Sequence, residues 1–350
     1  MAPPVASSND SPPGETLAGI GEWELIRRLS AFAPAGQFSD DAAVLRDGVG
    51  GGDGALVLNT DVLVDGLHFS DATTRPADVG WRAAAANLSD LAAMGCTEVL
   101  GLTVGLVAPA TTPWSWVEGV YQGLSEALTT HGGVLLGGDC SGGRQRLLAI
   151  TALGRLDPEA GPIQRRDGRP GDLLVSTGTH GLSALGLALL QGDAHRGGLE
   201  SLEPALKHRA IAAHRRPKPR LDAVHALRSS RPAGRTWRVG GCDSSDGLAA
   251  AVTAIATASG CGAELDQERL PQDPGMAAVP QALTWCLGGG EDFELVLALE
   301  PRWAQALLAG LPGATVIGRL VAESPGVMRW SDEAPWSPGD PAIRGFQHFG

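Results

Sequence analysis

The sequence predicts a two-domain α/β (α+β) protein in which each domain contains a mixed β-sheet with helices on one face. Strand-like and helix-like segments alternate along both halves of the chain, and 350 residues are too many for one compact core but suit two. A stretch rich in proline, arginine and glycine over 157–171 interrupts this alternation. It marks the expected boundary between an N-terminal domain, 21–156, and a C-terminal domain, 157–350.

The N-terminal part begins with 20 residues that lack a basic or strongly apolar segment, so we expect a disordered tail over 1–20. The first helix should be amphipathic, with Trp23, Ile26 and Leu29 on one face. The glycine-rich segment 48–54 opens no helix and is interpreted as a hairpin connection. The elements expected here are a helix over 22–32, strands over 42–45 and 55–59, a helix over 77–94, a strand over 99–107, a helix over 114–131, and strands over 133–138 and 147–154.

The C-terminal half repeats the alternation after the boundary. Its expected elements are a strand over 172–177, a helix over 181–191, helices near 201–213 and 219–228, a strand over 237–242, a helix over 247–259, a strand over 293–299, a helix over 302–309 and a strand over 314–319. Two glycine-rich segments, Gly137–Asp139 and Thr177–Gly181, are candidates for lying against phosphates.

Charge and composition exclude several classes of partner. The net charge of −12 and the pI near 5.1 oppose binding to nucleic acid or to an anionic membrane surface. Only Lys207 and Lys218 are lysines, so arginine or bound metal must neutralise an anionic substrate. The five cysteines are widely spaced without a Cys-x-x-Cys pair, which favours a reduced, cytoplasmic setting.

Acidic residues recur at the ends of apolar segments, beside glycine, serine, threonine or asparagine. These positions are Asp40-Asp41, Asn59-Thr60-Asp61, Asp139, Asp243 with Asp246, and Glu291-Asp292. Ligand-binding side chains of α/β proteins gather at strand ends, where a rigid sheet holds them outside the core. Each aspartate alone is also explained as a turn or helix cap, but together they predict a shared site.

Asp90 differs because it lies inside an otherwise apolar helix, on the same face as Asn87. A buried carboxylate needs a cation, hydrogen-bond donors or a proton, whereas a surface aspartate needs none of them. If these carboxylates converge, their oxygen ligands select a hard cation such as Mg²⁺. The sequence contains no P-loop, no protein-kinase signature, no Gly-x-Ser-x-Gly and no His-Glu-x-x-His.

Seven segments resemble the thiamine-monophosphate kinase family, of the superfamily that includes aminoimidazole ribonucleotide synthetase and selenophosphate synthetase. They are Asn59–Phe69, Asn87–Gly95, Gly137–Asp139, Arg169–Asp172, Asp243–Gly247, Gly289–Leu295 and Phe346–Phe349. The resemblance extends from about Gly21 to Gly350. It implies a homodimer whose N-terminal sheets pair into a barrel-like interface, and ATP-dependent phosphorylation of thiamine monophosphate by in-line transfer, assisted by several Mg²⁺ ions and without a phosphoenzyme.

The resemblance also implies residue roles. The metal ligands would be Asp40, Asn59, Thr60, Asp61, Asp90, Asp139, Asp243 and Asp246. The ATP contacts would be Tyr121, Gly138, Asp139, Arg165 and Ser245, with Arg166 an alternative to Arg165. The thiamine side would contact His68, Glu291 and Phe346, with Asp292 an alternative to Glu291. His68, Tyr121 and Phe346 are also explained as ordinary packing residues.

The chain departs from the family pattern in three places. Gln37-Phe38-Ser39 replaces Gly-Ile-Gly, Asn59 replaces a hydroxyl residue, and Cys140-Ser141 replaces a threonine pair. Asparagine still offers a neutral oxygen, whereas cysteine is a poor Mg²⁺ ligand. Two alternative functions remain open: a related ATP-dependent enzyme with another small acceptor, as in selenophosphate synthetase, or a catalytically silent dimeric nucleotide-binding protein.

Overall fold

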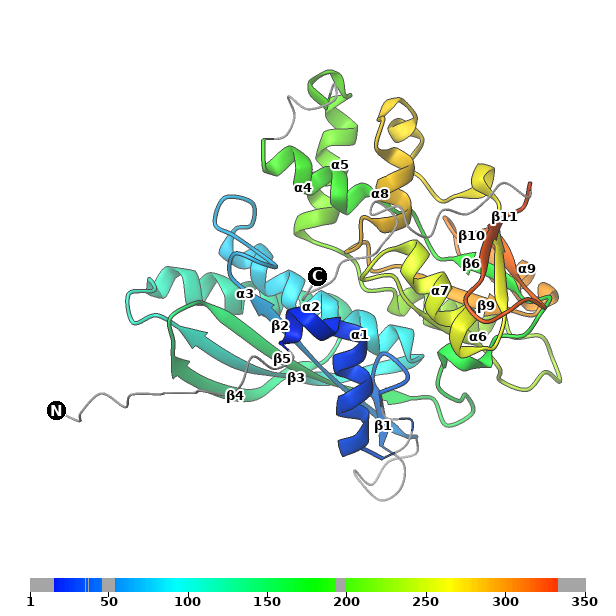
Figure 1. The fold of residues 1–350 in the computed structure, drawn as a ribbon. Coiled ribbons are helices and arrows are strands. Elements are labelled where there is room, and N and C mark those ends of the chain that lie inside the picture. The colour runs from blue at the N-terminus through cyan, green and yellow to red at the C-terminus, as the bar shows by residue number, and fades with distance from the viewer. Residues whose placement is uncertain (1–15, 35, 37, 46–53, 193–198, 333–350) are drawn as a thin grey trace. The chain divides into compact units, whose positions relative to one another are not determined.

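The computed structural model describes residues 16–34, 36, 38–45, 54–192 and 199–332 (Figure 1). The expected tail up to residue 15, most of the hairpin connection and Phe346 lie outside these residues. The chain divides into two units, one of which ends at Phe38 and contains α1 (Leu17–Leu29) and η1 (Ser30–Phe32). Thr16 caps α1 by accepting a hydrogen bond from the N–H of Gly19, and no residue of α1 is buried.

The second unit begins at Ser39 and contains a five-stranded mixed sheet in its N-terminal half. Its strands are β1 (Ala43–Leu45), β2 (Leu56–Val64), β3 (Cys96–Ala108), β4 (Val134–Gly142) and β5 (Leu147–Leu156). They lie in the order β1-β2-β5-β3-β4, and only β3 and β4 pair in parallel. Residues of β5 alternate between buried and half-buried, which is typical of a sheet covered on one face.

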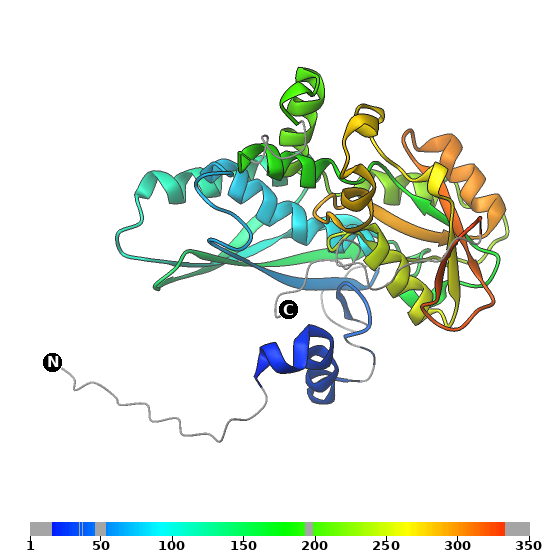
Figure 2. The ribbon, with the colours of Figure 1, turned by 45° about the horizontal axis from the view of Figure 1, so that its top comes forward.

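Helices α2 (Pro76–Ala93) and α3 (Trp114–His131) cover that face (Figures 1 and 2). They pack backbone to backbone at two glycines. A Cβ atom on Gly80 would lie 1.9 Å from the carbonyl oxygen of Val120, and one on Gly123 would lie 1.8 Å from that of Ala77. One glycine on each helix therefore lets α2 and α3 approach each other closely.

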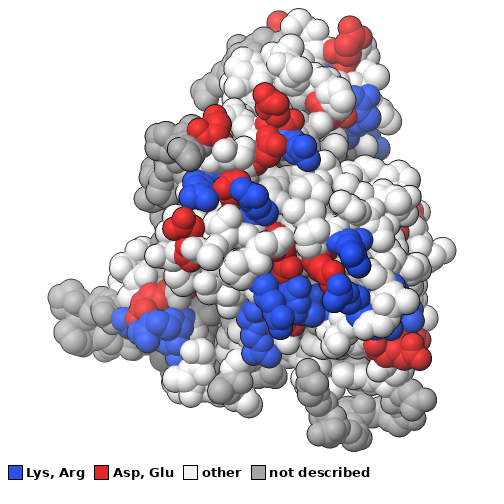
Figure 3. Space-filling model, turned by 90° about the vertical axis from the view of Figure 1, so that its right-hand side faces the viewer, with Lys and Arg blue, Asp and Glu red and all other residues white. Residues whose placement is uncertain are grey.

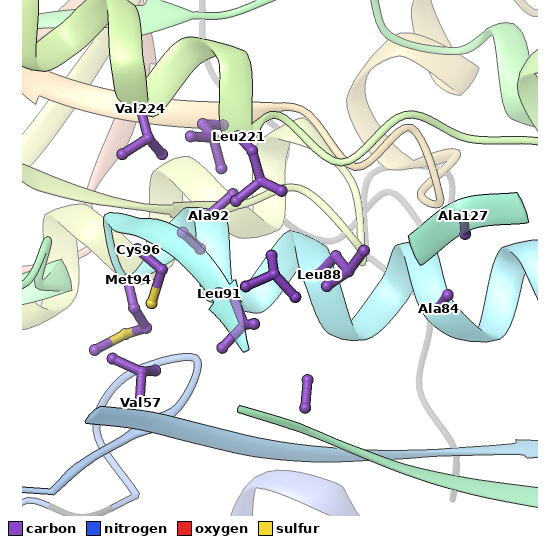
Figure 4. Packing of buried hydrophobic residues seen from close by; sticks show 14 of the residues in the cluster. Val57, Ala84, Leu88, Leu91, Ala92, Met94, Cys96, Ala127, Leu221 and Val224 are labelled. Atoms are coloured by element: carbon purple, nitrogen blue, oxygen red, sulfur yellow. The ribbon is translucent and has the colours of Figure 1, made fainter. Parts of the chain in front are cut away.

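The core passes through α2 into the C-terminal half (Figure 4). Leu88 and Leu91 of α2 pack in one buried cluster with Val57 of β2 and with Leu221 and Val224 of α6 (Leu221–Ser229). Helix α2 is thus buried between the N-terminal sheet and the C-terminal domain, so its polar residues are held rigidly at the junction of the two domains.

The C-terminal domain contains a six-stranded mixed sheet in the order β11-β8-β10-β6-β9-β7. Its strands are β6 (Leu173–Ser176), β7 (Gly240–Asp243), β8 (Gly262–Leu265), β9 (Leu295–Leu299), β10 (Thr315–Val321) and β11 (Met328–Trp330). Its other helices are α4 (Leu182–Leu190), α5 (Pro204–Arg215), α7 (Leu248–Ala258), α8 (Ala282–Gly288) and α9 (Pro301–Gly310), with short 3-10 turns that include η2 (Arg165–Asp167).

This sheet carries helices on both of its faces. Every residue of β9 is buried: Leu297 packs in the cluster that contains Trp303 of α9, whereas Val296 packs in the one that contains Ile255 of α7. The predicted class, two domains with mixed sheets and helices, is confirmed, and the second helical layer is an addition to it. The short elements β8, β11 and α8 were not expected from the sequence. The hydrogen bonds of β8 and β11 come from distant strands, and α8 has only seven residues, too few for a clear helical period.

Basic and acidic side chains lie next to one another on the face shown in Figure 3. Ion pairs of this kind in the C-terminal domain join Arg238 to Asp172 at 2.6 Å and Arg319 to Glu264 at 2.8 Å. Several arginines are therefore already neutralised by a carboxylate. In the part of the chain that the structure describes, none of the helices has the length and apolar character needed to cross a membrane.

Candidate functional site

Three aspartates from distant segments converge at the junction of the domains. Asp41 precedes β1, Asp90 lies in the last turn of α2, and Asp243 ends β7. One carboxylate oxygen from each lies within 4.8 Å of the others. Among the described residues, this is the group of acidic or metal-ligating side chains that could hold a metal ion.

Neighbouring polar side chains orient two of these carboxylates. Asn59 of β2 donates a hydrogen bond to Oδ2 of Asp90 at 2.7 Å, across the interface between sheet and helix. Ser89, next to Asp90 on α2, donates to Oδ2 of Asp243 at 2.7 Å, and Ser245 donates to Oδ1 of Asp243 at 3.0 Å. The site is therefore held by hydrogen bonds between the two domains.

The three carboxylates repel one another in a partly dehydrated setting. Burial, followed by the charges of Asp61, Asp243 and Asp41, raises the pKa of Asp90 well above its usual value. Burial raises the pKa of Asp41 to about 7, and it raises the pKa of Asp243 as well. Positive charge from a bound ion or ligand would favour the ionised form of all three carboxylates.

Arg165 of η2 supplies one positive charge beside the cluster. Its guanidinium group donates to Oδ1 of Asp41. Burial acts against the charged form of Arg165, but Asp41 raises the pKa of the guanidinium above its usual value. One arginine cannot balance Asp41, Asp90, Asp243 and the nearby Asp61. The all-oxygen donor set and its negative charge fit Mg²⁺, which prefers carboxylates and retains several waters.

The two residues assigned by resemblance as alternatives at this position differ in their contacts. Arg165 contacts Asp41, whereas Arg166 is exposed and donates to the side chain of Gln164 at 3.1 Å. Ser245 lies beside Asp243 in the turn before α7, where Asp246 is exposed. Arg165 and Ser245 therefore lie next to the aspartate cluster, and Asp246 lies three residues from it in the same turn.

Asp40 and Asp41 both belong to the acidic positions that the sequence pattern indicated, but the resemblance assigned only Asp40 as a metal ligand. Oδ1 of Asp40 accepts a hydrogen bond from the backbone N–H of Arg165 at 2.9 Å, and its Oδ2 accepts one from Gln164 at 3.1 Å. Asp40 thus holds the turn that carries Arg165, while Asp41 faces the other carboxylates. Residues 39–42 form a bend before β1, and nothing in the sequence says which of the two carboxylates faces the site.

The alternation of side chains along a strand separates Thr60 from its neighbours on β2. Asn59 bonds to Asp90, and the backbone N–H of Asp61 donates to Oδ1 of Asn87 at 3.2 Å. The Thr60 hydroxyl instead lies 2.8 Å from that of Thr151 and is exposed to solvent. The structure brings Asn59 and Asp61 to the helix-covered face, but not the side chain of Thr60.

Tyr121, Gly138 and Asp139 lie at the opposite edge of the N-terminal sheet. Tyr121 of α3 is half-buried and lines a cavity of about 420 Å³ that also contacts Val134 of β4. A Cβ atom on Gly138 would lie 2.0 Å from the carbonyl oxygen of Val104, so this position requires glycine. Asp139 is exposed on β4, the edge strand. Within one chain, these three residues are not brought to the aspartate cluster.

The two described residues assigned to the thiamine side, His68 and Glu291, both contact Arg82 of α2. His68 is half-buried in the loop after β2, and its Nδ1 accepts a hydrogen bond from the N–H of Val64 at 3.0 Å. Glu291 forms an ion pair with the buried Arg82 of α2 at 2.5 Å. Glu291 also has a φ of 55°, a left-handed conformation that is strained for a residue other than glycine.

Asp292 has a structural environment that differs from that of Glu291. Its carboxylate accepts hydrogen bonds from the N–H groups of Gly181 and Ser183, at 2.7 and 3.0 Å. The start of α4, which the sequence offered as a phosphate-binding element, is therefore already bound by a carboxylate of the same chain. The two acidic residues therefore have different partners: Glu291 pairs with Arg82, whereas Asp292 caps α4.

The fold and the candidate site together indicate the class of protein to which the chain belongs. Residues 39–156 match the N-terminal domain, and residues 169–331 the C-terminal domain, of the AIR synthase related proteins. This chain is 48% identical over 335 residues to a thiamine-monophosphate kinase of Synechococcus elongatus, with 95% of this chain and 98% of the relative covered. It is 45% identical over 318 residues to one of Prochlorococcus marinus, with 91% and 93% covered.

A solved structure of AaThiL complexed with AMPPCP and TMP superimposes with a TM-score of 0.79 and 27% sequence identity. That superposition covers 96% of this chain and 99% of the other. The chain belongs to the thiamine-monophosphate kinase family of enzymes.

Proposed function

We propose that this chain transfers the γ-phosphoryl group of ATP to thiamine monophosphate, forming thiamine diphosphate and ADP. The convergence of Asp41, Asp90 and Asp243 beside Arg165 carries the proposal, in a chain that belongs to this family. A cluster of carboxylates that needs cations is suited to holding two phosphate-bearing molecules through shared metal ions.

Several Mg²⁺ ions are the cofactors in this proposal. Asp41, Asp90 and Asp243 would hold them, with Asp61 and the Asn59 side chain nearby. When bound, these ions supply positive charge that neutralises both phosphates and the transferred phosphoryl group. We assign Asp41 to this role in place of Asp40, because Asp40 is engaged with η2.

The remaining chemistry needs orientation more than acid–base catalysis. A phosphate oxygen of thiamine monophosphate is already ionised near neutral pH, so it forms the new P–O bond directly while the bond to the β-phosphate oxygen breaks and ADP leaves. Arg165 and Ser245 would orient the nucleotide phosphates, and no general base or phosphoenzyme is required. His68 and Glu291 would contact the thiamine side; the role of Phe346 stays a prediction.

The exposed edge of the N-terminal sheet supports a homodimer. All nine residues of β4 are exposed, including Val134, Leu135 and Leu136 at 59, 45 and 51%. A long apolar edge strand favours pairing with another strand. Asp139 of β4 is paired with Gly105 of β3, Gly105 with Ala149 of β5, and Ala149 with Val62 of β2. Asp139 therefore lies three strand spacings, or about 14 Å, from Val62. In the proposed dimer, Asp139 and Tyr121 of the partner would complete the site that one chain leaves open.

We place this enzyme in the cytoplasm, where thiols stay reduced. The five cysteines are free, and four of them are buried.

Steady-state ADP release with ATP, Mg²⁺ and a panel of small phosphate acceptors tests the proposed function. Release should depend on thiamine monophosphate, with thiamine diphosphate as the second product. Release dependent on another acceptor would favour the selenophosphate synthetase-like alternative, and binding of ATP without any acceptor-dependent release would favour a catalytically silent protein. A covalent label on the protein after incubation with γ-labelled ATP would contradict direct transfer.

A further inference from the structure

Arg82 is a buried cation that the metal and nucleotide roles above do not use. It lies on α2, and only 3% of its surface is exposed. An arginine is rarely buried so completely unless its guanidinium group is bound on several sides. Its partners come from three segments that are far apart in the sequence.

Those partners include both described residues of the proposed thiamine side. Nη2 of Arg82 lies 2.5 Å from Oε1 of Glu291 and 3.5 Å from the carbonyl oxygen of His68. Nη1 donates to the carbonyl oxygen of His214, in the last turn of α5. One planar group thus contacts the loop after β2, the segment between α8 and β9, and the end of α5.

We propose that Arg82 is the positioning residue of the acceptor subsite: its guanidinium group holds Glu291 and the His68 loop at the spacing that the thiamine moiety of the acceptor requires. This inference rests on the proposed function, and it assigns to Arg82 an action through Glu291 and His68 rather than a contact with the reacting phosphates.

The geometry leaves one oxygen of Glu291 available for a ligand. Oε1 is bound by Arg82, whereas Oε2 lies 3.7 Å from Nδ1 of His214, and the Glu291 side chain remains 34% exposed. Burial lowers the pKa of His214 to about 4, so this ring is uncharged at neutral pH and does not neutralise Oε2. A partly exposed carboxylate of this kind suits the cationic thiazolium ring of the acceptor.

The strained backbone of this segment explains why a firm hold is needed. Glu291 and Phe293 have φ values of 55° and 51°, which non-glycine residues adopt only where surrounding contacts impose them. The N–H of Glu291 donates to the carbonyl oxygen of Ser245 at 2.7 Å, and Asp292 caps α4. These bonds fix the backbone, and Arg82 fixes the side chain.

The decisive variant is Arg82→Lys, which keeps the positive charge but cannot bond in two directions as the planar guanidinium does. We expect its KM for thiamine monophosphate to rise about tenfold or more, as for a lost charge-assisted hydrogen bond, while its KM for ATP stays within about twofold. Calorimetric titration with thiamine monophosphate alone should show the same loss of affinity. Because Arg82 acts partly through Glu291, the loss of acceptor affinity in Arg82→Lys combined with Glu291→Gln should be smaller than the sum of the two single losses.

Arg216→Met is the matched control. Arg216 pairs with Asp78, one helical turn before Arg82 on the same helix, at 2.8 Å, and its described contacts include neither His68 nor Glu291. This variant should lower the melting temperature without changing the KM for thiamine monophosphate. Unchanged acceptor affinity in Arg82→Lys, or an equal rise in both KM values, would overturn the positioning role. Wild-type protein that neither binds nor phosphorylates thiamine monophosphate would overturn the proposed function itself.

Discussion

The hydroxyl of Ser89 donates to Oδ2 of Asp243 at 2.7 Å, and this bond joins the N-terminal domain to the C-terminal one within the aspartate cluster. Ser89 is fully buried on α2, next to Asp90, and Asp243 ends β7. Two candidate metal ligands from different domains are therefore linked through adjacent residues of one helix. The bond also lowers the pKa of Asp243 against the effect of burial, which keeps this carboxylate more readily ionised.

Ser89→Ala should lower kcat/KM about tenfold, because Asp243 loses a hydrogen bond that orients it. The Mg²⁺ concentration for half-maximal activity should rise by a similar factor. Ser229→Ala is the control, since that helical serine donates to the carbonyl oxygen of His225 four residues earlier. Equal kinetics in Ser89→Ala and wild type would show that this bond does not position the ligand.

Asp41→Asn should mainly affect catalysis, whereas Asp40→Asn should mainly affect stability. Asp41→Asn should lose at least about a hundredfold in kcat with its fold intact, because Asp41 is in the cluster. Asp40→Asn should mainly lower the melting temperature, because Asp40 binds the η2 turn. Steady-state kinetics and thermal unfolding of both variants make the comparison, and a reversed pattern would restore Asp40 as the ligand.

Asp90→Asn should stabilise the protein when divalent ions are removed by a chelator. Burial and the charges of Asp61, Asp243 and Asp41 disfavour the ionised Asp90, so a neutral amide relieves that repulsion. We expect the melting temperature of Asp90→Asn without metal to exceed that of the wild type by about 2 °C or more. Adding Mg²⁺ should raise the melting temperature of the variant by less than it raises that of the wild type. A wild-type melting temperature that does not change when Mg²⁺ is added would argue against a metal site at this cluster.

His180 should make the protein sensitive to acid. It is fully buried between Ser176 and Ser244, and burial lowers its pKa from 6.5 to about 4. The folded state therefore binds fewer protons than the unfolded chain between these pH values, and stability falls as pH drops from 6.5 to 4. In His180→Asn, the slope of unfolding free energy against pH should be shallower by about 1.4 kcal/mol per pH unit. Urea unfolding across this range measures it, and an unchanged slope would contradict the assignment.

Asp139→Asn should abolish turnover, and mixing it with Asp90→Asn should restore part of it. In the proposed dimer, Asp139 acts in the partner's site, so a mixed dimer contains one site with both aspartates intact. Co-expression of the two inactive variants should then yield about a quarter of wild-type activity, since half of the dimers are mixed and each has one working site. Full inactivity of the purified mixed dimer would place Asp139 in the site of its own chain.

Local patterns sufficed for much of the fold. Helix 77–94 was predicted and α2 spans Pro76–Ala93, and helix 114–131 coincides with α3, because helix-forming residue types and their periodicity act over a few residues. The predicted set of strand-end aspartates contained Asp243, and the polar position inside an apolar helix identified Asp90. Both types of signal can be recognised in the amino-acid sequence alone.

Which side chains meet could be known only from the folded chain. Asp40 and Asp41 are the same residue type in adjacent positions, and their opposite directions depend on how the segment packs against η2. The role of Arg82 was invisible as well, since its partners are supplied by the loop after β2, the end of α5 and the segment before β9. Residue type and spacing determine which groups are available for chemistry, whereas long-range packing determines their mutual distances, on which charge interactions depend.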